Sequence, residues 1–273
     1  MHSNSSAKDM AKKGLDNLLS NKSQNIVDVM LGRENTQTVS SDMLVEEVQK
    51  RVWNALKQDQ QYSDVITDSD RFLRDNVFSS TTMIVMYVDL VGSTQMVMDL
   101  PQKQLAMIVS SFAQEMGYVI KQHNGYILKY VGDAVIGYFA EKGSVANIAD
   151  SSVSCAESML KVVKTGINPV LQQYDYPDLA IKIGIDFGEN TIIRYGDNEE
   201  ESHVDLLGPS MNMAAKIQGH AQPDQILIGD QVYKKLDSAI QEYFEQVKWK
   251  DSIWNYRNKV TGKIYPVYAY VGK

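Results

Sequence analysis

The stretch LKYVGDAVIGYF, at residues 128–139, decides the expected fold. Apolar runs at 126–131 and 134–139 predict two strands, and the Gly132–Asp133 pair between them is favourable chemistry for a tight hairpin turn. Lys129 is the exception, because it places a cation inside the first apolar run. The stretch therefore predicts a β-hairpin with a lysine in one strand and an aspartate in its turn.

The composition limits the class of protein. The chain has 273 residues, 44% of them hydrophobic, and a net charge of −7, which allows a large core and argues against a nucleic-acid partner. Its single cysteine, Cys155, cannot form an internal disulfide and is expected to be a buried small residue. No apolar stretch is long enough to span a membrane, and the N-terminus lacks the apolar segment of a signal peptide. We expect a soluble, cytoplasmic protein.

The chain divides into three predicted regions. Residues 1–41 are polar and predicted to be loosely ordered, with a short helix. Residues 42–75 form an amphipathic helical segment, whose apolar stripe either packs on its own domain or serves as a dimerisation or regulatory element. Residues 76–273 are predicted to form the main domain.

The order of elements in this domain predicts an α+β fold. Strands and helices alternate in a way that favours an antiparallel or mixed sheet with helices on one face, and there is no Gly-rich Walker loop. Phosphate chemistry must therefore use metals and cations. The predicted elements are a strand at 83–90, a helix at 102–124, a second long helix at 145–173, two strands around a turn at 187–190, a helix at 209–221, a strand at 225–229 and a final strand within 263–271.

Two aspartates are candidates for metal binding. Asp89 ends the first strand, and Asp133 lies in the hairpin turn, so both meet at one sheet edge if the hairpin pairs beside that strand. Two close carboxylates suit Mg²⁺, which favours one or two carboxylates together with substrate phosphate oxygens. In the loop after Asp89, Gly92 permits close backbone approach, while Ser93 and Thr94 offer hydrogen-bond donors to phosphate.

The motifs VDLVGST and LKYVGDAVIGYF resemble the two metal-binding motifs of the class III nucleotide cyclases. The segments IGIDFGENTI, VDLLGPSMNMAAKI and YPVYAY resemble later motifs of that family in the same order, so the resemblance covers about residues 81–271. It implies a ferredoxin-like or palm-type antiparallel sheet with helices packed on it. It also implies that ATP is converted to 3′,5′-cyclic AMP and pyrophosphate, as in signal transduction.

The resemblance implies roles for individual residues. Asp89, Asp133 and the backbone carbonyl of Leu90 would bind two divalent ions, Mg²⁺ or Mn²⁺. Lys129 and Asp205 match the pair that reads the base. Lysine only donates hydrogen bonds and aspartate only accepts them, which complements the N1 acceptor and the C6 amine of adenine and mismatches guanine. An unpaired buried polar group costs about 1–3 kcal/mol, so this pair favours ATP over GTP.

Further family positions fall on the last third of the chain. Asn212 matches the asparagine that positions the ribose. Four residues later the family usually has an arginine that stabilises the transition-state phosphate, whereas this chain has Lys216, which keeps the charge but loses the planar fork of donors. Lys259 and Lys263 are both candidates for the lysine that holds the terminal phosphates, and the sequence does not choose between them.

The resemblance also implies the assembly. In this family the metal-binding and base-reading residues of one site come from different subunits, so a chain with both sets implies a homodimer with two sites. The alternatives are a catalytically silent cyclase-like module, which Lys216 favours, a different metal-dependent nucleotide enzyme such as a diguanylate-forming cyclase, and a pure interaction protein. The adenine-type pair and the missing acidic Gly-Gly turn argue against the second.

Overall fold

The computed structural model describes residues 41–57, 67–140, 145–198, 202–250, 253–257 and 261–272. The chain divides into two compact units, 1–39 and 40–273, and the described residues all belong to the second. Of the polar segment predicted at 1–41, residues 1–40 lie outside the described residues.

The main element is a mixed sheet with the strand order β2-β3-β1-β4-β6-β8-β7, in which β5 pairs with β4 beside this path. All neighbours are antiparallel except β4 and β6, which are parallel, so the prediction of an antiparallel or mixed sheet is confirmed. The strands are β1 (Ser80–Leu90), β2 (Tyr126–Val131), β3 (Ala134–Ala140), β4 (Ile181–Tyr195), β5 (His203–Leu207), β6 (Gln225–Gly229), β7 (Phe244–Gln246) and β8 (Val267–Tyr270).

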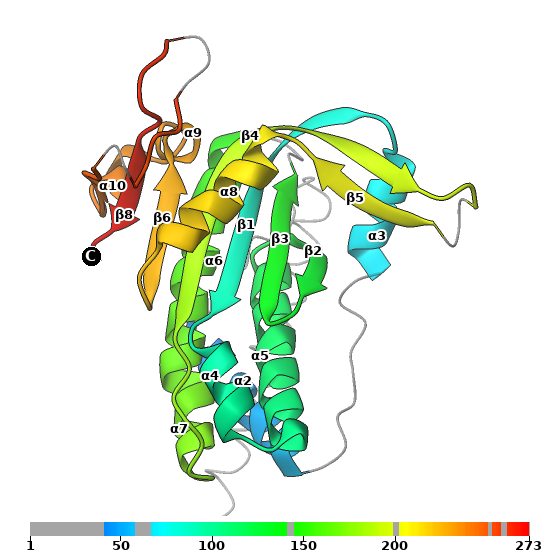
Figure 1. The fold of residues 1–273 in the computed structure, drawn as a ribbon, viewed down its shortest axis with the longest axis vertical. Helices are drawn as coiled ribbons and strands as arrows, with labels where there is room; N and C mark the ends of the chain where they lie inside the picture. The colour runs from blue at the N-terminus through cyan, green and yellow to red at the C-terminus, as the bar shows by residue number, and fades with distance from the viewer. Residues whose placement is uncertain are drawn as a thin grey trace, which may run out of the picture. The chain divides into compact units, whose positions relative to one another are not determined.

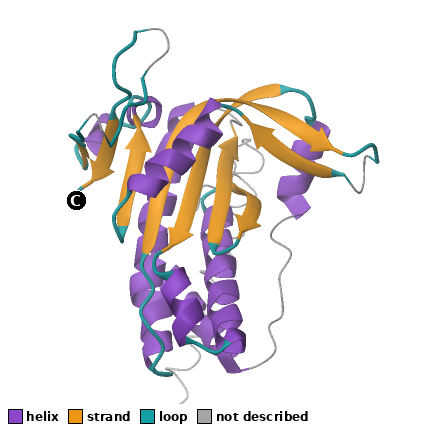
Figure 2. Cartoon of the chain, in the orientation of Figure 1, coloured by secondary structure: helices purple, strands orange, loops and turns teal. Residues whose placement is uncertain are grey.

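Helices cover both faces of the sheet, so the prediction of helices on one face is wrong. Figure 1 shows α8 in front of the sheet and α5 and α6 behind it, and Figure 2 shows the same two layers by secondary structure. The helices are α2 (Ser41–Lys57), α3 (Thr67–Asp75), α4 (Ser93–Asp99), α5 (Gln102–Gln122), α6 (Val145–Lys161), the π-helix η1 (Val162–Ile167), α7 (Asn168–Gln172), α8 (Pro209–His220), α9 (Asp230–Tyr233) and α10 (Ser238–Gln241).

The prediction of a turn at 187–190 is wrong, because β4 is one continuous strand. β1 pairs with β4 along its whole length, from Ser80 opposite Thr191 to Leu90 opposite Ile181, and this ladder includes the residues expected to turn. Asn190 is buried and bonds Ser210 instead of closing a turn. The last five residues of β4, Thr191–Tyr195, pair with β5, which begins after the acidic loop.

The final strand is shorter than predicted. β8 covers only residues 267–270 of the predicted 263–271. Pro266 precedes it and has no N–H to donate to a ladder. Ile264 makes only an isolated bridge to Arg257.

The second predicted helix, at 145–173, is a helical run with a π-helix in its middle. η1 lies between α6 and α7, and Pro169, which has no N–H to donate, follows it in α7. A Cβ on Gly166 of η1 would lie only 3.0 Å from a methyl group of Val48, so α2 packs closely on the π-helix here. Val48 and Val52 are fully buried, which means that this part of the α2 stripe packs on its own unit.

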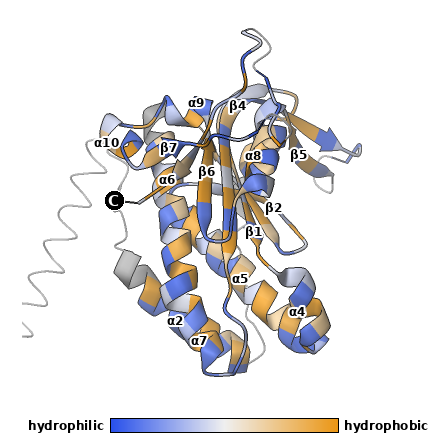
Figure 3. Ribbon diagram, turned by 60° about the vertical axis from the view of Figure 1, so that its left-hand side comes forward, coloured by the Kyte–Doolittle hydropathy of each residue, from blue (hydrophilic) through white to orange (hydrophobic). Residues whose placement is uncertain are grey.

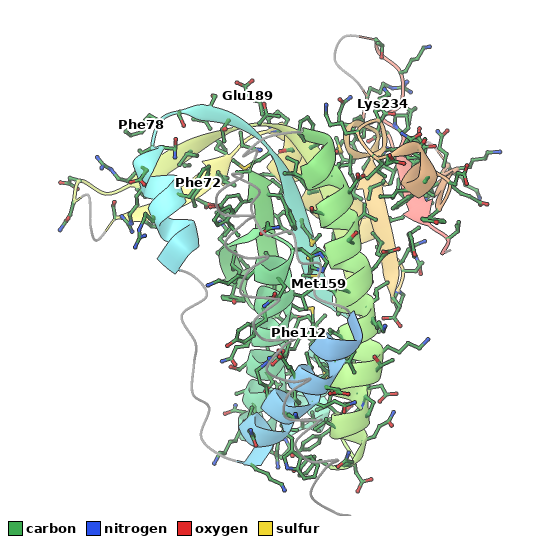
Figure 4. All side chains as sticks on the ribbon, turned by 180° about the vertical axis from the view of Figure 1, so that it is seen from behind. Phe72, Phe78, Phe112, Met159, Glu189 and Lys234 are labelled. Carbon is green, nitrogen blue, oxygen red and sulfur yellow. The ribbon has the colours of Figure 1, made fainter. Side chains whose placement is uncertain are left out.

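Two apolar layers form the core. Phe112 of α5 and Met159 of α6 are fully buried (Figure 4), as is Cys155 of α6, as predicted. On the other face, Phe72 of α3 stacks on Tyr126 with ring centres 5.5 Å apart. Hydrophobic and hydrophilic residues alternate along α2 and α6 (Figure 3). No helix in the described part of the chain is long and apolar enough to cross a membrane.

Candidate active site

The two candidate metal-binding carboxylates lie at the same end of the sheet. Val88 of β1 is opposite Val135 of β3, so the residues that follow Val88 run past the hairpin turn that holds Asp133. Asp89 is half-buried, and its pKa is raised first by burial and then by the charge of Asp133. The hairpin therefore brings the two carboxylates close together, and a cation between them would relieve their repulsion.

This pair fits a magnesium or manganese site that is completed by substrate. Mg²⁺ is usually held by one or two carboxylates plus phosphate oxygens and water, whereas an all-protein site needs more ligands. Within the described ranges no group of three or more His, Cys, Asp or Glu side chains could hold a metal alone. Leu90 is the last residue of β1, beside Asp89, and its carbonyl stays a predicted ligand.

The loop after Asp89 has the backbone conformation that is expected from its glycine, Gly92. Gly92 has a φ of 75°, in the left-handed region that favours glycine, and it begins the helix α4. Ser93 and Thr94 form the first turn of this helix, which has only 7 residues and therefore a small dipole. Their predicted phosphate contacts stay predictions.

Lys129 and Asp205 form an ion pair. The Lys129 Nζ lies 2.5 Å from the Asp205 Oδ2, although the residues come from strands β2 and β5. The ladder between β2 and β3 shifts at Leu128, which is a β-bulge. In a regular strand Lys129 would point away from Tyr126 and Leu128, whereas the bulge lets all three face the side of the sheet that carries α8.

The Asp205 carboxylate accepts a hydrogen bond from the neighbouring backbone and lies near a second titratable group, Tyr87. Its Oδ1 accepts a hydrogen bond of 2.9 Å from the Leu206 N–H, which leaves Oδ2 for Lys129. The pKa of Tyr87 is raised by burial and then by the negative charge of Asp205. Tyr87 pairs with Ile136 of β3, and Ile136 pairs with Lys129 of β2. The three residues therefore lie side by side on neighbouring strands.

Helix α8 presents Asn212 and Lys216 one turn apart, and both side chains are exposed. The Lys216 ammonium lies 4.6 Å from the ring centre of Tyr256, a cation–π contact. Asn190 and Ser210 bond each other beneath the start of α8, and both are about 1% exposed. This buried pair holds the connection between β5 and α8 in place.

The two C-terminal lysines are only partly covered by the structure. Lys259 lies outside the described residues. Lys263 is exposed, next to Gly262, whose φ is 67°. Its predicted role at the terminal phosphates stays a prediction.

Gln218 of α8 is a residue that the sequence reasoning missed. Its Nε2 donates a hydrogen bond of 3.2 Å to the Oδ2 of Asp89. Two helical residues correspond to a rotation of about 200°, so Gln218 points to nearly the opposite side of α8 from Lys216. The helical periodicity of α8 could have placed Gln218 on its inner face, but no local pattern indicated its contact with Asp89.

Comparisons with known proteins identify the family and the fold. Residues 77–262 match the model of the adenylate and guanylate cyclase catalytic domain. A cytidylate cyclase of Escherichia coli is 21% identical over 176 residues, covering 62% of this chain and 38% of that protein. A uridylate cyclase of Burkholderia cepacia is 28% identical over 180 residues, covering 63% of this chain and 76% of that protein. The crystal structure of the adenylyl cyclase CyaB from P. aeruginosa has a TM-score of 0.56 at 21% identity, covering 71% of this chain and 96% of that chain.

The chain belongs to the adenylate and guanylate cyclase catalytic domain family, the class III nucleotide cyclases. Its α+β fold, a mixed sheet with helices on it, is the fold of these catalytic domains. The chain spans only 38% and 43% of the length of two cytidylate cyclases that it matches, from E. coli and Staphylococcus aureus.

Proposed function

We propose that this chain cyclises ATP to 3′,5′-cyclic AMP and releases pyrophosphate. The observation that carries the proposal is the contact of 2.5 Å between Lys129 and Asp205, which holds one donor and one acceptor side by side. Adenine offers the complementary pair, an acceptor at N1 and an amine at C6. A bound base would take the place of the direct contact and satisfy both side chains.

The same chemistry makes CTP the second candidate substrate. Cytosine also has a ring acceptor, N3, next to an amine, so Lys129 and Asp205 complement it as they complement adenine. The E. coli and S. aureus relatives are named cytidylate cyclases, which supports this alternative. Guanine and uracil both present a carbonyl acceptor next to an N–H donor. These groups stand in the reverse order from those of adenine and cytosine. With Lys129 and Asp205 fixed in the positions that read adenine they would be mismatched, so GTP and UTP are disfavoured on this ground, although the B. cepacia relative is named a uridylate cyclase.

In the proposed site each residue has a limited task. Asp89, Asp133 and the Leu90 carbonyl would hold two divalent ions, which when bound lower the pKa of the attacking 3′-hydroxyl and neutralise the phosphates. Asn212 orients the ribose, so that its 3′ oxygen is in line with the α-phosphorus. Lys216 stabilises the charge that develops on the phosphate oxygens. The bond between the α-phosphorus and the pyrophosphate oxygen breaks as the bond from the 3′ oxygen forms, and the proton of the 3′-hydroxyl passes to water.

We further propose that the active form is a homodimer. The interactions described above fall into two groups. The first is the proposed metal-binding group, which consists of Asp89, Asp133 and Gln218. The second is the proposed base-reading group, which consists of Lys129, Asp205 and Tyr87. In a dimer, the first group of one protomer would face the second group of its partner. Activity should then depend on protein concentration below the dimer dissociation constant, and analytical ultracentrifugation under the same conditions should show the matching monomer.

The test is product formation from each of the four nucleoside triphosphates. Purified full chain is incubated with ATP, CTP, GTP or UTP and Mn²⁺ or Mg²⁺, beside the Asp133→Asn variant and an Asp99→Asn control. Asp99 is exposed and binds Gln95, so its variant tests the loss of an aspartate away from the site. Cyclic AMP as the main product, lost only in Asp133→Asn, supports the proposal. Cyclic CMP as the main product supports the second candidate.

A catalytically silent nucleotide-binding module is the remaining alternative, and Lys216 is the observation that favours it. Its ammonium lies against Tyr256, and it lacks the donor fork of arginine. Binding of ATP and Mn²⁺ by a dimer that forms no cyclic product would support this module. Activity gained on Lys216→Arg would then identify the lysine as the cause.

A further inference from the structure

Asp89 has an unusual setting for a proposed metal ligand. The neighbouring charge of Asp133 repels it, and Lys182 lies near enough to lower its pKa. Its carboxylate accepts a hydrogen bond of 3.2 Å from a neutral amide, that of Gln218, and another from the Leu90 N–H. A neutral donor can hold a carboxylate in place without the net charge with which a lysine or arginine would oppose a metal ion.

The fold is built to bring Gln218 to this position. Asp89 is opposite Lys182 in β4, and Gly184 lies two residues further along that strand. A Cβ on Gly184 would lie 2.3 Å from the backbone N of Gln218, so only glycine lets α8 rest this close to β4. Gln218 thus reaches across the end of the sheet from a helix whose other side carries Asn212 and Lys216.

We propose that Gln218 is a positioning residue for the Asp89 carboxylate, a role that rests on the proposed metal-dependent function. Its amide holds Oδ2 against the repulsion of Asp133 and so keeps the carboxylate in place for a metal ion. Groups that orient a metal ligand in this way typically change metal affinity by about 10–100-fold when they are removed. The proposal also makes α8 a link between the two kinds of site residue, because it touches Asp89 on one side and presents Lys216 on the other.

The experiment measures Mn²⁺ binding directly, by electron paramagnetic resonance of free Mn²⁺ in titrations of the full-length protein. The variants are Gln218→Met, which keeps the length without the donor, and Gln218→Asn, whose donor is one methylene short. The matched control is Gln172→Met, because Gln172 makes the same amide-to-carboxylate bond, to Asp178, at 2.8 Å on the surface. Asp89→Asn marks the loss of the site, and thermal unfolding checks that each variant is folded.

The expected result is an increase in the Mn²⁺ Kd of about tenfold in both Gln218 variants, with none in Gln172→Met. The ratio of activity with Mn²⁺ to activity with Mg²⁺ should also rise, because Mg²⁺ tolerates distorted ligand geometry less well. If Asp89→Asn loses Mn²⁺ binding while folded Gln218 variants bind like the wild type, the positioning role is overturned and the proposed function stands. A wild-type protein that binds no more Mn²⁺ than Asp89→Asn, also when a nucleoside triphosphate is present, overturns both.

Discussion

Arg51 of α2 binds Glu115 of α5 with a fork of hydrogen bonds, the shortest of which joins Nη2 and Oε2 at 2.6 Å. Glu115 is only 2% exposed, and burial raises its pKa although Arg51 opposes the shift. The Arg51 guanidinium also lies 4.6 Å from the ring centre of Tyr118. One side chain of α2 therefore neutralises a carboxylate that is buried under it, which couples the position of α2 to the charge of α5.

Removing Arg51 should destabilise the domain. Arg51→Ala leaves Glu115 without its partner, and breaking a buried pair costs about 3–5 kcal/mol. Arg51 is one-third exposed, so we expect a lower loss of about 2–3 kcal/mol in the free energy of unfolding. Urea unfolding followed by circular dichroism measures it. Lys50→Ala, an exposed neighbour, is the control, and an equal small loss in both variants would contradict the role of the pair.

Asp205→Ala should weaken the use of ATP and reduce base selection. The C6 amine of adenine would lose its acceptor, and Lys129 would lose its partner, so we expect kcat/KM for ATP to fall by about 10- to 100-fold. The ratio of ATP to GTP turnover should fall as well, because the mismatch with guanine is also removed. Steady-state kinetics with both nucleotides measure this. Glu47→Ala, which removes an exposed carboxylate from an ion pair, should change neither value.

Lys216→Arg should increase the rate of the chemical step. An arginine could donate two hydrogen bonds to the phosphate, and one additional charge-assisted bond is worth about 1.5 kcal/mol or more, which corresponds to about tenfold in kcat. KM should change little, because the interaction strengthens in the transition state. Lys216→Met is the opposite control and should lower kcat. An arginine variant with unchanged kcat and KM would mean that this position does not contact the reacting phosphate.

The stability of the domain should fall as the pH rises from about 4 to about 7, because of Asp186. Burial raises the pKa of this carboxyl from 3.8 to about 7, although Tyr265 donates a hydrogen bond of 2.7 Å to it and the Phe187 N–H also bonds it. Asp230, whose charge raises the pKa further, is itself paired with Lys234. A raised pKa means that the folded state binds more protons than the unfolded state, so stability is lost as the pH rises through this window.

Asp186→Asn should remove this pH dependence and stabilise the protein at pH 8 relative to the wild type. The amide oxygen still accepts from Tyr265 and carries no charge. Urea unfolding between pH 4 and pH 8 measures the effect, with Asp178→Asn as an exposed control. A wild-type stability that stays level or rises across this window, with Asp186→Asn parallel to it, would contradict the prediction.

Local patterns in the sequence predicted most elements of the fold. The hairpin at 126–140 and the helices α5 and α8 occur as expected, because turn chemistry and helical periodicity act over a few residues. The turn at 187–190 was wrong because Gly188 and Asn190 serve other purposes. Gly188 makes room for Ser210, and Asn190 binds Ser210, so both residues allow α8 to pack on an unbroken strand.

The candidate site was predicted less completely. The contact between Lys129 and Asp205 agrees with the resemblance, while the roles of these residues stay predictions. Gln218 and Asp89 are 129 positions apart, and only the packing of α8 on Gly184 brings them together. No residue type near Leu128 indicates the bulge, because the bulge follows from the register between β2 and β3. The regulatory or dimerisation role predicted for residues 42–75 stays a prediction, which removal of residues 1–75 would test.

The unbroken course of β4 has a mechanical consequence. One strand pairs with β1 near Asp89 and with β5 at Asp205, so it fixes the spacing between these two residues within a protomer. A strand rises by about 3.4 Å per residue, and faces are kept only by slips of an even number of residues. The smallest slip that preserves the core would thus displace Asp205 relative to Asp89 by about 7 Å, so their spacing can be adjusted finely by bending β4 but not by sliding it.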